Sequence, residues 1–154
     1  MSAEAAWTRT GVVAALVLLC DQITKALIES SIALGDSRRV LPGVSFVHAR
    51  NSGVAFSLLT GSEGAVVAVT VVIVAAVLGF FAANRRRRFL WLVTGLIVGG
   101  ALGNLLDRIR TGAVTDFVQL PHWPAFNLAD SAITLGVVGL FLILGRGEAA
   151  ARTA

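Results

Sequence analysis

Hydrophobic positions along the chain fall into four long runs separated by more polar segments. The runs cover residues 11–28, 65–83, 89–106 and 126–144. Each run is close to the ~20 residues that a helix needs to cross the hydrocarbon core of a bilayer. The pattern therefore predicts a mainly α-helical membrane protein with four transmembrane helices, and we expect residues 1–154 to form a single integral-membrane domain.

The first run also invites comparison with a cleavable signal sequence, because Arg9 and a short polar start precede it. It lacks the small-x-small pattern of a cleavage site, and it continues into Asp21 and Lys25 in helical register. Lipid attachment at Cys20 is disfavoured, since the bulky Leu19 precedes it where a small residue is expected. We therefore expect a permanent span with Cys20 as a small core residue.

The longest interruption, residues 31–62, has a different pattern. It combines glycine, proline and serine with short β-prone runs at residues 44–47 and around 54–56. Turn residues that flank such runs predict a small hairpin or sheet. We expect this β-rich segment to lie on the membrane surface. Two roles are open for Asn51 in this segment: a turn residue, or a residue that lines a substrate site.

Composition supports a membrane protein over a nucleic-acid-binding one. Hydrophobic residues make up 56% of the chain and charged residues 14%, whereas about a quarter of the residues of soluble proteins are charged. Mean hydropathy is +0.81. The net charge of +4 does not reflect a basic face with interleaved aromatics, because Arg85 to Arg88 form one run between two apolar segments. We expect no nucleic-acid partner.

The same arginine run predicts the orientation in the membrane. Basic residues accumulate in cytoplasmic loops, so the run places both termini in the cytoplasm and residues 31–62 and 107–125 outside. The bias is incomplete, because five arginines fall on the outer side: Arg38, Arg39, Arg50, Arg108 and Arg110. With this orientation, four aspartates gather at the outer face: Asp21, Asp107, Asp116 and Asp130.

Polar residues in the first span lie on one helical face. Asp21 and Lys25 are four residues apart, so they can pair, which lowers the cost of placing either near lipid. A structural ion pair and a role in lining a substrate site both fit this spacing.

The third and fourth spans also carry spaced small and polar residues. A stripe of glycines every four residues predicts close helix packing, and polar side chains follow it at the helix end: Gly95, Gly99, Gly103, Asn104, Asp107 and Arg108. Asp130 lies near the start of the last span, where the helix dipole favours an anion. A capping charge would explain it without catalysis.

Among the side chains that could catalyse a reaction, the sequence favours the aspartate carboxyl groups. A serine or cysteine nucleophile needs a base, and neither His48 nor His122 lies in a recognisable catalytic motif. The histidines and the one cysteine also lack the spacing of zinc ligands. Two aspartates that share a partly desolvated site can divide one proton and activate water. Spacing alone leaves open which two aspartates would do so.

Two other classes of protein also fit parts of the pattern. A small transporter or channel subunit could use the aspartates as an ion or proton path, but then charges should spread through the depth of the spans. A membrane scaffold would explain the glycine stripe, but not the aspartates or the three asparagines Asn51, Asn104 and Asn127.

Five segments in order resemble the motif set of the lipoprotein signal peptidases, also called signal peptidase II. They are residues 21–25, 51–56, 99–108, 114–117 and 126–130. Each motif is weak alone, and the ordered set is highly specific. Val54 departs conservatively from the alanine that is common in the family.

The resemblance implies an aspartic endopeptidase of the bacterial cytoplasmic (inner) membrane. Its substrates would be diacylglyceryl-modified prolipoproteins, cut N-terminal to the lipidated cysteine, and we expect a monomer without cofactor or metal. By motif position, Asp116 and Asp130 would be the catalytic pair. Seven residues would line or support the site: Asp21, Lys25, Asn51, Gly100, Asn104, Arg108 and Asn127. Asp107, beside Arg108, would then be an ion-pair partner.

Overall fold

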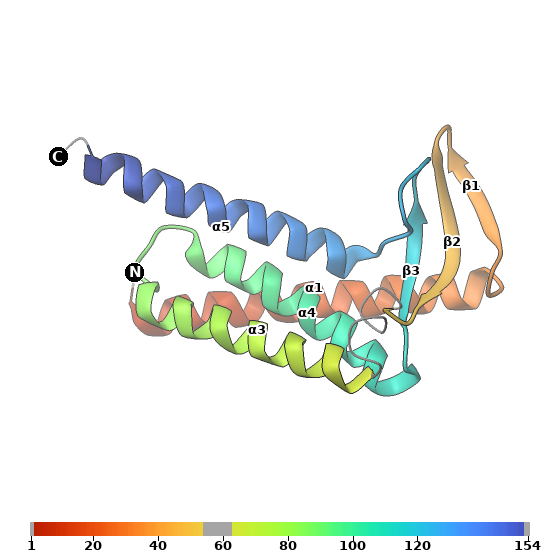
Figure 1. Ribbon diagram of the computed structural model, residues 1–154, viewed down its shortest axis with the longest axis horizontal. Helices are drawn as coiled ribbons and strands as arrows, with labels where there is room; N and C mark the ends of the chain where they lie inside the picture. The colour runs from red at the N-terminus through yellow and green to blue at the C-terminus, as the bar shows by residue number, and fades with distance from the viewer. Residues whose placement is uncertain (1, 54–62, 153–154) are drawn as a thin grey trace.

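Long helices lie side by side and strands gather at one end of the bundle in the computed structural model, which describes residues 2–53 and 63–152 (Figure 1). The elements in chain order are α1 (Ala3–Ser31), β1 (Ser37–Leu41), β2 (Val44–Asn51), α3 (Glu63–Asn84), α4 (Leu90–Thr111), β3 (Val114–Gln119) and α5 (Leu128–Arg152). Figure 1 shows the two termini and the α3–α4 connection at the end of the bundle that lies away from the strands.

The predicted membrane architecture is confirmed. Within the described residues, four helical segments are long and apolar enough to cross a membrane: Ala3–Ser31, Gly64–Asn84, Leu90–Thr111 and Leu128–Gly145. They correspond to the four hydrophobic runs. Most residues in the apolar part of α4 are buried inside the bundle, whereas few residues of the other three spans are buried. Helix α4 is therefore the central helix, and it packs against α1, α3 and α5.

The glycine stripe explains how closely α4 approaches its neighbours. A Cβ atom on Gly99 would lie 2.6 Å from the backbone oxygen of Ala14 in α1. A Cβ atom on Gly103 would lie 2.5 Å from the Asp21 carboxylate, also in α1. Gly100 faces α5 instead, where a Cβ atom would lie 2.5 Å from the Ala129 backbone oxygen. The prediction of close packing along this stripe is confirmed, and the stripe leads directly to a buried charged group.

The predicted β-rich segment is present as an antiparallel hairpin of β1 and β2. In the described part of the chain these strands form a sheet with β3, in the order β1-β2-β3. The sequence did not predict β3: residues 107–125 were expected only as an outer loop between the third and fourth spans, whereas Asp116 in this stretch lies in β3, opposite Ala49 of β2. The β-prone run around residues 54–56 lies outside the described residues.

Cys20 differs from the sequence-based expectation. We expected a core residue, but Cys20 is exposed. The buried face of α1 in this region carries Asp21, Lys25 and Ile28. Because successive residues of a helix point about 100° apart, the side chain directly before Asp21 faces away from α4.

Candidate active site

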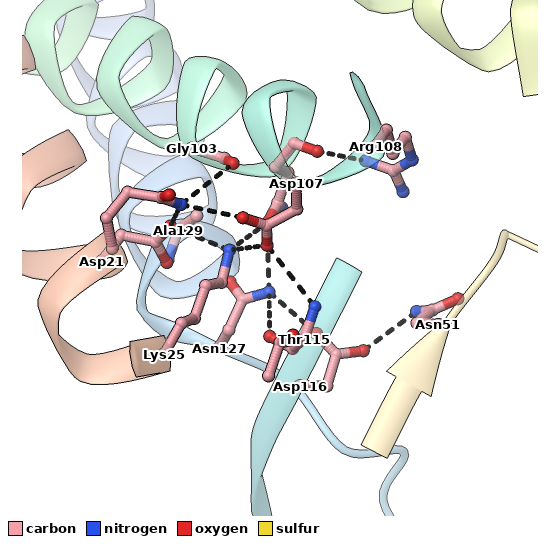
Figure 2. Close-up of polar contacts among 12 residues, drawn as sticks. Asp21, Lys25, Asn51, Gly103, Asp107, Arg108, Thr115, Asp116, Asn127 and Ala129 are labelled. Carbon is pink, nitrogen blue, oxygen red and sulfur yellow. Dashed lines mark hydrogen bonds and ion pairs between the residues drawn. The ribbon is translucent and has the colours of Figure 1, made fainter. Parts of the chain in front are cut away.

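A cluster of buried polar side chains lies where α1, α4, β3 and the start of α5 meet. Burying charged groups is costly unless they are paired and hydrogen-bonded, so their partners show how the cluster is stabilised. Its buried members are Asp21, Lys25, Asn104, Asp107, Thr115, Asp116 and Asn127. Residues from four elements that are distant in sequence therefore form one continuous network (Figure 2).

The Lys25 ammonium group lies at the centre of one half of the network. Its Nζ atom is 2.8 Å from Asp21 Oδ2 and 2.7 Å from Asp107 Oδ2. It also donates a hydrogen bond of 3.0 Å to Asn104 Oδ1. The predicted pairing of Asp21 with Lys25 is present, and Asp107 is an ion-pair partner of the same lysine. Figure 2 shows Lys25 directed from α1 toward Asp107 of α4.

Asp21 and its neighbour Gln22 connect α1 to the other helices. Asp21 Oδ1 accepts a hydrogen bond of 3.0 Å from the backbone N–H of Ala129, at the start of α5. Gln22 Nε2 donates to Asp107 Oδ1 at 2.9 Å. Helix α1 thereby fixes the position of both α4 and the first turn of α5.

The start of α5 carries a reciprocal cap. Asn127 Oδ1 accepts the backbone N–H of Asp130 at 2.9 Å, and Asp130 Oδ2 accepts the backbone N–H of Asn127 at 3.2 Å. This arrangement is a capping box, in which each side chain satisfies a backbone donor that the helix leaves free. The remaining oxygen, Asp130 Oδ1, accepts from Asn104 Nδ2 at 2.8 Å. The cap therefore fixes the direction of the Asp130 carboxylate.

Asp116 lies on β3 with both carboxylate oxygens engaged. Oδ1 accepts from Asn127 Nδ2 at 2.8 Å, and Oδ2 accepts from Asn51 Nδ2 at 3.0 Å. Asn127 thus contacts both Asp116 and Asp130, which connects the two aspartates through one amide side chain.

Burial raises the pKa of Asp116 from 3.8 to about 6. Loss of solvation is the largest cause, and the negative charge of Asp130 raises the pKa further. The hydrogen bonds from Asn51 and Asn127 and the positive charge of Lys25 act in the opposite direction. Desolvation disfavours the charged form of a carboxyl group, whereas donors and cations favour it. Asp116 therefore holds a proton more readily than an exposed aspartate.

The three asparagines have orientations fixed by their surroundings. An ammonium group has no acceptor, so Asn104 must turn its oxygen toward Lys25 and its nitrogen toward Asp130. Asn51 Oδ1 accepts the backbone N–H of Gly53 at 2.9 Å, which turns its nitrogen toward Asp116. Each amide is consequently a donor to an aspartate.

Arg108 and Gly100 lie at the margins of this network. Arg108 donates through Nη1 to the backbone oxygen of Asn104 at 3.3 Å, and among the described residues its buried Nε has no hydrogen-bond partner. Figure 2 draws its side chain apart from Lys25 and Asp107. Gly100 contributes space, because it allows α4 to approach the backbone at Ala129.

The structure adds network residues that the sequence analysis did not select. Besides Gln22, these are Thr115 and Glu29. Thr115 donates through its hydroxyl to Glu29 Oε1 at 2.6 Å and through its backbone N–H to Asp107 Oδ2 at 3.4 Å. Gln22 carried a signal, as an amide beside Asp21 within a hydrophobic run. The Thr115 and Glu29 contact depends on how β3 lies against α1, which no local pattern indicates.

In the part of the chain that the structure describes, neither histidine hydrogen-bonds to the aspartates of this network. His48 is buried on β2, and its Nδ1 lies 2.9 Å from the backbone oxygen of Ile32. Within residues 2–53 and 63–152, no group of three or more histidine, cysteine or acidic side chains is arranged to hold a metal ion. The described network offers carboxyl and amide groups for chemistry.

A family model described as "Signal peptidase (SPase) II" matches residues 13–145. The chain belongs to the signal peptidase II family. The resemblance seen in the sequence motifs is thereby confirmed, and membership makes this signal peptidase II homologue a protease. The transporter and scaffold alternatives are left without support.

Individual relatives agree with this family. The chain is 38% identical to a lipoprotein signal peptidase of Halothermothrix orenii over 138 residues, which cover 89% of this chain and 95% of the relative. It is 45% identical to a lipoprotein signal peptidase of Pelotomaculum thermopropionicum over 134 residues, which cover 86% of each chain.

Solved structures show that the fold is shared as well. A bacterial membrane enzyme solved at 1.9 Å resolution has a TM-score of 0.80 and 32% identity, with 88% of this chain and 91% of the other covered. A second, solved at 2.3 Å, has a TM-score of 0.81 and 33% identity, with 89% and 87% covered. This signal peptidase II homologue is a multi-pass bacterial membrane protein.

Proposed function

We propose that Asp116 and Asp130 are the catalytic pair with which this aspartic peptidase cleaves signal peptides from prolipoproteins. The observation that carries the proposal is the Asn127 side chain, which contacts both carboxyl-bearing residues. Substrates are diacylglyceryl-modified, and the cut lies N-terminal to the lipidated cysteine. The whole chain acts as one peptidase domain and as a monomer.

The two aspartates have different surroundings, which supports different roles. Asp116 has a pKa of about 6 and takes the shared proton. Asp130 lies in the first turn of α5, where the helix dipole favours an anion. Asp130 therefore acts as the base that deprotonates water, and the protonated Asp116 polarises the scissile carbonyl.

Proton transfers complete the hydrolysis. The hydroxide that forms from water attacks the carbonyl carbon, and Asp130 holds the proton taken from that water. Collapse of the tetrahedral intermediate breaks the C–N bond, and the leaving amine receives a proton from the pair. One water molecule is consumed, and the pair returns to its single-proton state.

The other predicted site residues support this pair. Asn51, Asn104 and Asn127 donate to the carboxylates and hold them in place. Asp21 and Lys25 fix the first turn of α5 and the Asn104 amide. Gly100 allows the close approach of α4 to α5, and Arg108 supports the Asn104 backbone.

The orientation proposed from the arginine run agrees with the arrangement of the helices. The connection that carries Arg85 to Arg88 and both termini lie at one end of the bundle, and the strands lie at the other (Figure 1). Both termini are cytoplasmic, and the active site faces the extracytoplasmic side of the inner membrane. The β1–β2 hairpin there holds the extended peptide of the substrate.

Cleavage assays with the purified protein test the catalytic pair. We expect wild type to cut a diacylglyceryl-modified prolipoprotein directly before the modified cysteine and to leave the unlipidated form intact. Asp116→Asn and Asp130→Asn should fold and lose at least about 1,000-fold in kcat, as expected when an acid or base is removed. Asp36→Asn, at an exposed aspartate outside the cluster, is the matched control. Near-normal turnover of either site variant would exclude that aspartate from the pair.

Cysteine labelling tests the orientation. In a Cys20→Ser background, a membrane-impermeant maleimide applied to intact cells should label His122→Cys and leave Arg86→Cys unlabelled. Both positions are exposed, so accessibility alone does not separate them. The reverse result would invert the proposed orientation.

A further inference from the structure

A groove lies directly beside Asp130, between the β3–α5 connection and the outer surface of α5. It has a volume of about 470 Å³. Its apolar lining includes Trp123, Phe126 and Leu135, and Asp130 is part of the same lining. We refer to it as the Trp123 groove. An apolar groove that ends at a proposed catalytic carboxyl is suited to bind the part of the substrate next to the scissile bond.

The hydroxyl groups of the groove are already used by α5 itself. Ser131 Oγ donates to the backbone oxygen of Asn127 at 3.1 Å, and Thr134 Oγ1 donates to the backbone oxygen of Asp130 at 2.8 Å. A peptide backbone in this groove would need partners for its own N–H and C=O groups. A hydrocarbon chain needs none, so the lining favours an aliphatic occupant.

The groove is continuous with the lipid-facing surface of α5. Leu135 is 64% exposed, and Val138 and Leu142, at 52% and 59%, follow at positions i+3 and i+7 on the same helical face. From Leu135 to Leu142 the helix rises about 10 Å. An occupant can therefore enter sideways from the bilayer and lie along α5 without leaving the hydrocarbon.

Trp123 marks the other end of the groove. Its side chain is 64% exposed in the connection between β3 and α5. Tryptophan is favoured at membrane interfaces, where an apolar ring and a polar N–H meet headgroups and hydrocarbon. The groove thus extends from the level of the strands to the lipid-facing side of α5. An acyl chain of a glycerolipid runs in the same way, from the headgroup level into the hydrocarbon.

We infer that the Trp123 groove binds one acyl chain of the diacylglyceryl group on the substrate cysteine. This inference rests on the proposed function. The acyl chains are attached to the residue whose N-terminal peptide bond is cut, so a chain held beside Asp130 brings that bond to the catalytic pair. An unlipidated precursor lacks this contact, which gives a physical basis for selecting the lipidated form.

The experiment compares two substrates that differ only in chain length. Both are synthetic prolipoprotein peptides with the same sequence, carrying either two palmitoyl or two hexanoyl chains. Leu135→Trp fills the groove, and Leu142→Trp adds the same side chain on the same lipid-facing surface outside the groove. We expect the palmitoyl-to-hexanoyl ratio of kcat/KM to fall at least tenfold in Leu135→Trp and to stay within twofold of wild type in Leu142→Trp.

A second variant removes a wall of the groove without entering the helix. Trp123→Ala changes an exposed residue of a connection, so it should fold as wild type does, and it should also lower the chain-length ratio. Wild-type kcat/KM for both substrates in both Leu135→Trp and Trp123→Ala would overturn the inference, and would instead suit a bilayer lipid in the groove. Loss of activity by an equal factor for both substrates would overturn it as well, since a peptide side chain would then fit better.

The proposed function and this inference fail in different ways. Turnover by Asp116→Asn or Asp130→Asn would contradict the catalytic pair, whatever the groove variants do. Inactive aspartate variants together with an unchanged chain-length ratio would leave the catalytic pair intact and remove only the acyl-chain site.

Discussion

Asn127 and Asp130 cap the same helix start for each other. The Asn127 side chain accepts the Asp130 backbone N–H at 2.9 Å, and the Asp130 carboxylate accepts the Asn127 backbone N–H at 3.2 Å. Because Asn127 also donates to Asp116 at 2.8 Å, the start of α5 determines how the two aspartates lie relative to each other. Helix capping and the proposed chemistry therefore depend on the same side chain.

Substitution of Asn127 should separate these two roles. Asn127→Ala removes the cap, which should cost about 1 kcal/mol, and it removes the donor to Asp116. Asn127→Ser keeps a capping oxygen but is too short to provide the amide donor. We expect thermal unfolding in detergent to show Asn127→Ser near wild type and Asn127→Ala lower, whereas kcat falls about 100-fold in both, the usual loss for one donor at a reacting site. Normal turnover by Asn127→Ser would show that Asn127 acts as a helix cap and that its donor to Asp116 is not needed for catalysis.

The pKa of Asp116 predicts how activity depends on pH. Asp116 must be protonated in the active form, and its pKa is about 6 in the free protein. Above pH 6, kcat/KM should therefore fall as the pH rises, and the fall should approach tenfold per pH unit above about pH 7, because the pair loses its only proton. Bound substrate excludes water and favours the neutral acid, so the fall in kcat should begin at higher pH. A kcat/KM that rises through this range would contradict the assignment of the proton to Asp116.

Asn51 provides a sharper test of the same carboxyl group. Its hydrogen bond to Asp116 lowers the pKa of that group. Asn51→Ala removes the donor, so the pKa should rise and the alkaline fall of kcat/KM should move to higher pH. A residue that only supports the fold would change the amplitude of the profile and leave its midpoint in place. Profiles from purified wild type and Asn51→Ala, measured in one detergent, distinguish these results.

Local sequence patterns were enough to predict the spans and part of the network. The hydrophobic runs matched the helices because membrane thickness sets their length. The pairing of Asp21 with Lys25 followed from an i,i+4 spacing within one helix. The glycine stripe predicted close packing because only the absence of a side chain allows it.

The remaining features depend on contacts between distant segments. Strand β3 pairs with β2 across two membrane-spanning helices, so its short run of residues gave no local sign of a sheet. The contact between Lys25 and Asp107 depends on the rotation of α4 relative to α1. Asn127 could be recognised as a motif residue, but its two contacts become visible only when β3 and α5 are placed together.

Replacement of Lys25 should lower the stability of the protein, because its charge compensates two buried carboxylates. Its side chain is buried between Asp21 and Asp107. Lys25→Met leaves two buried carboxylates without their cation, which should destabilise the protein by about 3–5 kcal/mol. Thermal unfolding of the purified protein should show this loss. Arg110→Met removes an exposed cation that hydrogen-bonds to Gln22, and should change stability by less than about 1 kcal/mol.

Neutralising the partners provides the complementary test of Lys25. In the triple variant Lys25→Met, Asp21→Asn, Asp107→Asn, the buried carboxylates are replaced by amides, so much of the lost stability should return. Equal unfolding temperatures for the single and triple variants would show that the ammonium group stabilises the bundle in some way other than charge compensation.

Gly100 should be the glycine of α4 whose replacement affects catalysis most directly. A Cβ atom there would lie 2.5 Å from the Ala129 backbone oxygen and 2.9 Å from Ile133 Cγ1, so α5 must move away. That movement displaces the first turn of α5, which carries Asp130, and misplacement by about 1 Å can cost about 100-fold in rate.

Gly79→Ala in α3 is the matched control, since a Cβ atom there meets nothing within 4 Å, and it should be neutral or stabilising by about 0.5–1 kcal/mol. We expect Gly100→Ala to lower kcat by about 10-fold or more, because Asp130 is displaced with α5, while the protein still purifies as a folded species. Wild-type kcat in Gly100→Ala would mean that the position of Asp130 tolerates a shift of α5, and the capping box alone would then hold the pair together.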